Sequence, residues 1–141
     1  MENISHESVL VLLIRVILGI LFFFQGYDKL FKVKITGVIA FFEEEMKGKN
    51  VPRFILTSSA YFTSYVEFFC GGLVILGLFK TTALYLLGFD LVLVCGAFSM
   101  LKPMWDMQLL FPRLILLAAS LFFPTNWDVI SFDHLIKPWI H

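Results

Sequence analysis

The chain has 141 residues, of which 59% are hydrophobic and only 16% are charged, and its formal net charge is zero. Soluble domains are closer to half apolar and a quarter charged, so this composition indicates an integral membrane protein. A neutral chain has no general electrostatic attraction for nucleic acid, which excludes that class of partner. The length suits one domain, and we treat residues 1–141 as a single transmembrane unit.

The chain contains four apolar stretches, and each is close to the length that is needed to cross a bilayer core. We predict membrane-spanning helices over residues 9–31, 60–79, 81–101 and 109–123. Only Lys80 and Thr81 are clearly polar between the second and third spans, and the connection to the fourth is also short, so these spans pair as antiparallel neighbours. The predicted fold is all-α, a polytopic four-helix bundle in the lipid bilayer.

The connection between the first two spans is the longest and contains ITGVIAFFEEEMKGKN. Its apolar residues recur at helical spacing, with charged residues on the other side. This pattern predicts an amphipathic helix over residues 35–48 that lies on the membrane surface or caps the bundle. We interpret the run of three glutamates as a solvated helix face rather than as a metal site.

Four ionisable side chains lie inside the predicted spans, where charges are costly and usually face the bundle interior in pairs. These are Arg15, Glu67, Asp90 and Arg113. A helical rise of about 1.5 Å per residue places Arg15 and Asp90 at similar depths, and Glu67 and Arg113 deeper. We therefore predict two intramembrane ion pairs, Arg15 with Asp90 and Glu67 with Arg113.

The first span ends in Gln-Gly-Tyr-Asp-Lys, which contains Gln25 and Lys29. The same depth argument puts both residues toward the side of the bundle that holds Glu67 and Arg113. These four residues are our candidate binding site, a polar pocket for a quinone, a lipid headgroup or a proton. A second interpretation stays open, in which the buried charges only fix the register of the helices.

Signatures of catalysis and metal binding are absent from the sequence. The three histidines lie outside the predicted spans, which excludes a bis-histidine haem inside the bundle. No CxxC, HExxH, P-loop or GxGxxG motif occurs. Cys70 and Cys95 lie far apart in apolar runs and are expected to be buried thiols. We expect no metal and no covalently bound cofactor.

Several glycines occur within the first two predicted spans. In lipid, small residues let helix backbones approach one another closely. We therefore assign a helix-packing role to four of them: Gly19, Gly71, Gly72 and Gly77.

Two long segments of the sequence resemble the DoxX-like family of small four-helix membrane proteins. RVILGILFFFQGYDKLF is similar to the family's first span, with Arg15, Gly19 and a polar-Gly-x-x-Lys exit that ends at Lys29. EFFCGGLVILGLFKTTAL is similar to the second span, with a leading Glu67, paired glycines and Leu-Gly-Leu before a basic turn. The closing SFDHL is similar to the family's Ser-x-Asp ending.

The resemblance implies a link to quinone-coupled sulfur oxidation, terminal oxidases or membrane oxidoreductase complexes that handle oxidative stress. More distant relatives serve as maturation factors or chaperones. The positions that the resemblance carries over are Arg15, Gln25, Lys29, Glu67, Gly71 and Gly72. The segment FPRLILL departs from the family pattern, so the role of Arg113 rests on the depth argument alone.

We therefore expect a membrane accessory subunit of a quinone-linked oxidoreductase or a stress-related complex, without catalytic activity of its own. Quinone would bind between its helices, and a protein partner would lie beside it in the membrane. The alternative is a non-catalytic scaffold, chaperone or assembly factor for another membrane or secreted protein. The sequence leaves a homo-oligomer open, and it predicts a multi-pass location, in the inner (cytoplasmic) membrane if the source is bacterial.

Overall fold

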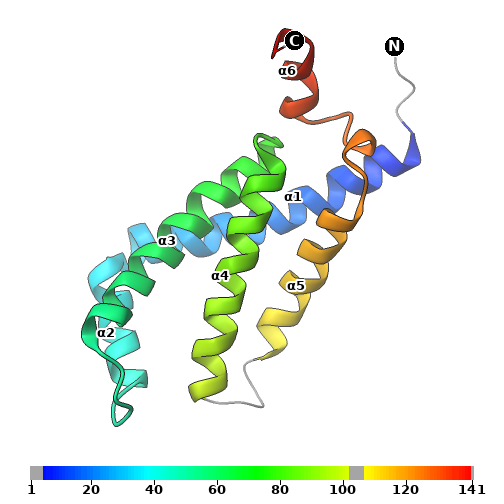
Figure 1. Cartoon of the computed structure of the whole chain (residues 1–141). Coiled ribbons are helices and arrows are strands. Elements are labelled where there is room, and N and C mark those ends of the chain that lie inside the picture. Colours follow the sequence, from blue (N-terminus) through cyan, green and yellow to red (C-terminus); the bar gives the residue numbers. More distant parts are fainter. Residues whose placement is uncertain (1–4, 102–106, 141) are drawn as a thin grey trace.

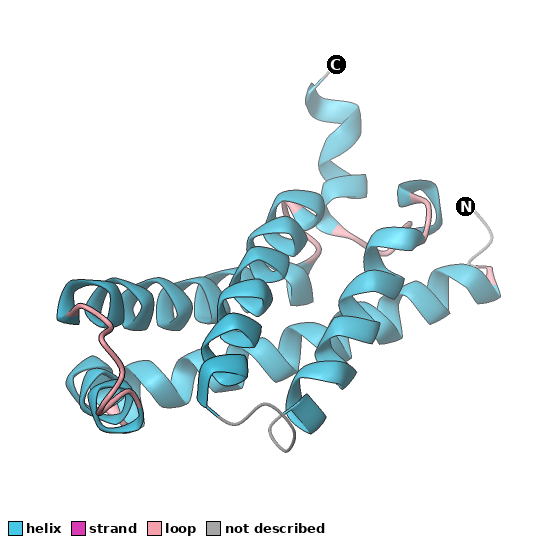
Figure 2. Cartoon of the chain, turned by 60° about the horizontal axis from the view of Figure 1, so that its bottom comes forward, coloured by secondary structure: helices cyan, strands magenta, loops and turns pink. Residues whose placement is uncertain are grey.

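The computed structural model describes residues 5–101 and 107–140, and all regular elements in these two ranges are helical. The elements are α1 (His6–Tyr27), η1 (Asp28–Lys32), α2 (Lys34–Glu45), α3 (Arg53–Leu76), α4 (Lys80–Leu101), α5 (Met107–Phe122), η2 (Thr125–Trp127) and α6 (Phe132–Ile140). Figure 1 shows α6 at the same end of the bundle as the start of α1. Figure 2 shows α1 and α3 side by side, with α4 and α5 lying across them.

Three helices of the described part are long and apolar enough to cross a membrane, at His6–Lys32, Arg53–Leu76 and Lys80–Ala97. A shorter apolar helix covers Leu110–Phe122. Between 33% and 39% of the residues in the three apolar windows are buried inside the protein, so most of the apolar surface is free to face lipid. The predicted all-α polytopic fold is confirmed.

The first span is one continuous helix that changes its winding near its end. Ser5 caps α1 by accepting the Ser8 N–H at 3.3 Å, as serine commonly does at this position. The last turns form the π-helical segment η1, in which Val33 N–H donates to the Asp28 carbonyl at 2.9 Å. Such segments are rare and frequently occur at functional sites. Lys34 then takes a φ of 61° as the chain enters α2.

The second span begins earlier than the predicted residue 60. Helix α3 starts at Arg53, directly after the extended Pro52. The hydropathy of its first turns is low because polar side chains occur there, although the backbone is already helical. The helix ends at Gly77, whose φ of 70° is left-handed. Leu78 N–H bonds to the Leu73 carbonyl at 3.0 Å, which is the Schellman pattern that favours glycine.

Glycines set the close contact between α1 and α3. A Cβ atom on Gly71 would lie 2.5 Å from the backbone nitrogen of Phe23, and one on Gly19 would lie 2.9 Å from the Gly71 carbonyl oxygen. Gly26, which the sequence analysis did not single out, meets the backbone of Phe68 in the same way. The two helix backbones therefore touch along several turns, as small residues permit in membranes.

The buried apolar core lies where the four spanning helices meet. Helix α1 packs along α3, and α4 contacts both α3 and α5. The core residues are Leu18, Phe22, Cys70, Val74, Ala83, Leu84, Leu87, Leu91, Leu110 and Leu117. This core leaves the later half of α4 and the first turns of α3 outside the tightest packing, and the candidate site lies between them.

Candidate binding site

A buried charged cluster fastens the end of the bundle that carries α6. Arg15 Nη1 lies 3.2 Å from Asp128 Oδ1, and Lys80 Nζ lies 2.8 Å from Asp128 Oδ2. Arg15 Nη2 also donates to the Ile130 carbonyl at 2.8 Å. All three charged side chains are buried. Two cations share one carboxylate, so each buried charge has the partner that it needs.

The predicted ion pair between Arg15 and Asp90 is therefore wrong. Arg15 reaches Asp128, which follows the last span and was left out of the depth argument. Lys80, at the start of α4, completes the cluster, whereas Asp90 lies about 15 Å further along the same helix. Depth alone could not reveal that the segment after α5 folds back onto the bundle.

The same end of the bundle fastens α6 to the start of α4. Asp133 Oδ1 and Oδ2 accept the backbone N–H groups of Phe79 and Lys80, each at 2.9 Å. Asp133 thus caps α4 from a distant part of the chain. Ser131 Oγ accepts the His134 N–H at 3.2 Å at the start of α6. The Ser-x-Asp ending noted in the sequence is a pair of helix caps.

A second charged cluster lies near the middle of the bundle. Lys29 Nζ lies 2.7 Å from Glu67 Oε2 and donates to Thr63 Oγ1 at 3.0 Å. The Glu67 side chain is 2% exposed and the Lys29 side chain 19%. Since Lys29 comes from η1 and Glu67 from α3, this ion pair joins the end of the first span to the second.

The predicted ion pair between Glu67 and Arg113 is also wrong, because Lys29 takes the place of Arg113. Arg113 lies close enough to attract Glu67 electrostatically, but it forms no ion pair with any residue that the structure describes. Its guanidinium instead lies 5.9 Å from the centre of the Phe22 ring, a cation–π distance. Asp90 faces the same cluster from α4 and is fully buried.

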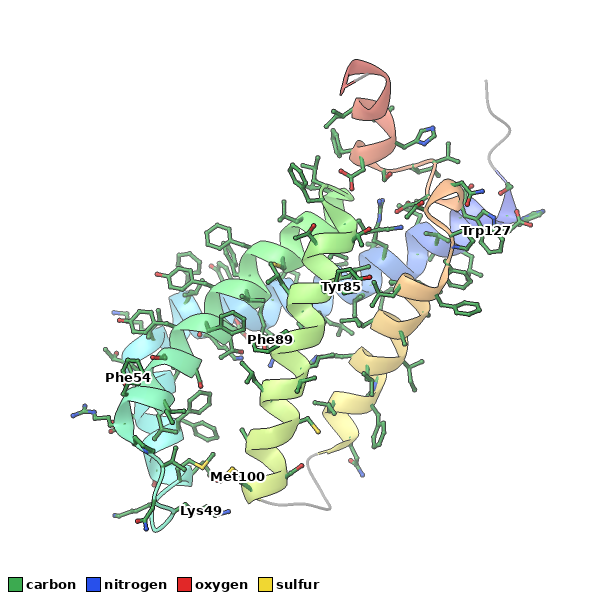
Figure 3. All side chains as sticks on the ribbon, in the orientation of Figure 1. Lys49, Phe54, Tyr85, Phe89, Met100 and Trp127 are labelled. Atoms are coloured by element: carbon green, nitrogen blue, oxygen red, sulfur yellow. The ribbon has the colours of Figure 1, made fainter. Side chains whose placement is uncertain are left out.

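A cavity of about 620 Å³ extends from this cluster toward α2. Its walls come from the last turn of α1, η1, α2, the first half of α3 and the second half of α4, and most of the wall residues are apolar. In Figure 1, α3 and α4 diverge from their connecting turn, and the cavity lies between their separated ends and α2. Figure 3 shows Met100, another wall residue, on the side of α4 that faces α2. Representative apolar wall residues are Val38, Phe42, Leu56, Leu93 and Ala97.

The polar end of the cavity is formed by Gln25, Lys29 and Thr63. Gln25 Oε1 is buried and has no hydrogen-bond partner among the described residues. Two of the four predicted binding residues thus line the cavity. Glu67 lies directly behind Lys29, and Arg113 is not on the wall.

The sequence analysis missed Thr63 and the contribution of α2 to the cavity. Thr63 could have been found, since it lies four residues before Glu67 and so on the same helix face. The apolar side of α2 was expected on the membrane surface or over the bundle, and the structure turns part of it into a cavity wall. In the part of the chain that the structure describes, no group of three or more His, Cys, Asp or Glu could hold a metal ion.

The fold and the cavity define a small polytopic membrane protein with a ligand-sized space among its helices. The family DoxX matches residues 10–100, more than half of the chain, and the protein belongs to the DoxX family. No curated protein and no solved structure matches the chain. The matched range includes Lys29, Glu67 and Asp90 but ends before α5, so Arg113 and Asp128 lie outside it.

Proposed function

We propose that this protein is a non-catalytic subunit of a quinone-linked membrane oxidoreductase or a stress-related membrane complex, and that it holds a quinone in the cavity between α2, α3 and α4. The observation that carries the proposal is the cavity itself: about 620 Å³ with mostly apolar walls and a polar end at Lys29. This volume lies within the usual range for small-molecule sites.

A quinone has a polar head and an apolar tail, which match the polar end and the apolar walls of the cavity. Its head carries carbonyl oxygens that only accept hydrogen bonds, and Lys29 offers three N–H donors. The carboxamide of Gln25 can donate to a quinone carbonyl or accept from a quinol hydroxyl. The isoprenoid tail would follow the apolar walls toward Met100. A site of this kind combines an apolar cavity with a few convergent polar groups.

Glu67 supports the proposed role of Lys29 without touching the ligand. Its carboxylate lies 2.7 Å from Lys29 Nζ, which favours the charged ammonium and holds it at the cavity end. Lys29 retains further donor capacity beyond Glu67 and Thr63 because an ammonium has three N–H groups. In this proposal the electrons are supplied and removed by partner subunits, and this chain contributes binding and orientation.

A substitution that fills the cavity tests the proposal. A Cβ atom on Gly96 meets no atom within 4 Å, and Gly96 lies on the cavity wall, so Gly96→Phe places its ring in open space. The matched control is Leu86→Phe, which adds a ring on the same helix at a side chain that is 41% exposed. Binding of a short-chain ubiquinone to the purified protein in nanodiscs is measured by calorimetry.

We expect saturable binding by the native protein and by Leu86→Phe, and binding at least about tenfold weaker, or about 1.4 kcal/mol, for Gly96→Phe. Equal affinities for all three proteins, or no saturable binding by the native protein, would contradict the proposal. A protein partner retained from native membranes without quinone would favour the alternative function as a scaffold or assembly factor.

A further inference from the structure

Asp90 is a buried carboxyl group in the middle of the bundle, beside Glu67 and Thr63. Its relative exposure is 0%. Neither Oδ1 nor Oδ2 has a hydrogen-bond partner in the described ranges of the chain, and neither takes part in an ion pair there. Glu67, the other carboxyl group of this cluster, has Lys29 at 2.7 Å. The two acids are neighbours, and only one of them is neutralised by a contacting cation.

Ionisable groups approach Asp90 from three other elements. They are Lys29 from η1, Glu67 and Cys70 from α3, and Arg113 from α5. Glu67 is a like charge and disfavours an ionised Asp90, whereas the two cations favour it. The state of Asp90 is therefore decided by whether either cation is free to contact it.

Lys29 and Arg113 both make their contacts with groups other than Asp90. Lys29 contacts Glu67 and donates to Thr63 Oγ1 at 3.0 Å. Arg113 lies over the Phe22 ring, with its guanidinium carbon 5.9 Å from the ring centre. An ionised carboxylate that is buried without a contacting cation or hydrogen-bond donor is very costly, and the group becomes neutral by binding a proton instead.

We propose that Asp90 is a proton-binding site, which holds a dissociable proton beside the ionised Glu67–Lys29 pair. When the proton leaves as H⁺, the carboxylate that remains takes Arg113 as its partner, because Arg113 is in electrostatic range and forms no ion pair within residues 5–101 and 107–140. Glu67 interacts with Asp90 and contacts Lys29, which lines the cavity, so these two side chains offer the proton a polar route to the cavity. The proposal does not depend on the identity of the cavity's ligand.

Infrared spectroscopy of the quinone-free protein in nanodiscs tests the proposal. At neutral pH the native protein is expected to show the C=O stretch of a protonated carboxylic acid. Asp90→Asn should remove this band, and Asp28→Asn, the same change at an exposed aspartate that pairs with Lys32, should retain it. Raising the pH should remove the band of the native protein reversibly.

Three results would overturn the proposal: no such band in the native protein at neutral pH, a band that survives in Asp90→Asn, or a band that is lost in Asp28→Asn. If Asp90→Asn does not fold, the native protein labelled with carboxyl-¹³C aspartate gives the answer. The band must then shift to lower frequency, and an unshifted band would assign the proton to a glutamate. Because this experiment uses no quinone, a negative result would contradict the proton-binding site without contradicting quinone binding in the cavity.

Discussion

Lys29 is the residue that connects the buried charges to the cavity. A single ammonium neutralises Glu67, bonds Thr63 and forms part of the cavity wall. Its position in the π-helical segment η1 places it at the junction of the first span and α2. A buried carboxylate that loses a contacting cation retains its full desolvation cost, so the Lys29–Glu67 pair should matter for stability as well as for binding.

Replacing Lys29 by methionine is predicted to destabilise the protein strongly. Breaking a buried ion pair by removing one partner costs about 3 kcal/mol or more. The matched control is Lys32→Met, which removes a lysine of the same segment whose exposed side chain pairs with Asp28. We expect no measurable change there, because exposed pairs contribute little. Thermal unfolding in a mild detergent compares the two variants.

A double variant separates loss of the charge pair from loss of packing. Lys29→Met combined with Glu67→Leu leaves no unpaired charge in the pair, and replacing both members of a buried pair by apolar groups is often tolerated. We therefore expect the double variant to regain part of the stability lost in Lys29→Met. If its loss were the sum of the two single losses, the buried ion pair would not be the cause.

At the scale of elements, the contact between α1 and α3 depends on individual glycines. Gly71→Ala brings a Cβ to 2.5 Å from the Phe23 backbone nitrogen, so the helices must separate, and overpacking of this kind costs about 1–3 kcal/mol. The adjacent Gly72 was also assigned to packing, but a Cβ there meets only the Phe23 ring at 3.6 Å, an ordinary contact. Gly72→Ala should therefore be neutral or slightly stabilising, since alanine favours the helix.

Unfolding of these two variants in detergent measures the difference directly. A larger loss in Gly71→Ala than in Gly72→Ala supports the close helix contact. Equal losses in the two neighbours would mean that the α1–α3 spacing does not depend on Gly71.

Helix rise and helix rotation explain which parts of the site could be predicted from the sequence. The rise per residue is fixed, so the sequence could place Lys29 toward the side of the bundle that holds Glu67, and these two side chains do meet. Rotation about each helix axis is set by packing, and it directs Lys29 rather than Arg113 to Glu67. Asp128 lies beyond the last apolar stretch, where an argument limited to the spans could not include it.

At the scale of the whole molecule, the two ends of the bundle are built differently. The end with α6 is fastened by Asp128 and Asp133, which tie the last segment to α1 and α4. In Figure 3, Trp127 lies beside the start of α1 at this end. At the other end α3 and α4 separate, and α2 closes the space between them into a cavity. One end is thus held together by ion pairs and helix caps, and the other contains the cavity of the proposed site.

The arrangement of α2 was the least predictable feature at this scale. Its amphipathic pattern is typical of a surface helix, but the glutamate run is only partly on an outer side. Glu44 is exposed and Glu43 pairs with Arg53 at 2.6 Å, whereas Glu45 lines the cavity. The apolar side, however, faces the bundle rather than lipid alone, with Val38 buried. Periodicity shows that a helix has an apolar side but not which surface covers it.

Photoaffinity labelling with an azido-quinone tests the central claim, quinone binding in the cavity, most directly. The purified protein in nanodiscs is irradiated with the probe, and the labelled residues are mapped by mass spectrometry. We predict labels on wall residues such as Met46, Ile55 and Met100, with labelling suppressed by excess unlabelled ubiquinone. Labels confined to the lipid-facing sides of α1 and α5, or labelling that excess ubiquinone does not reduce, would contradict it.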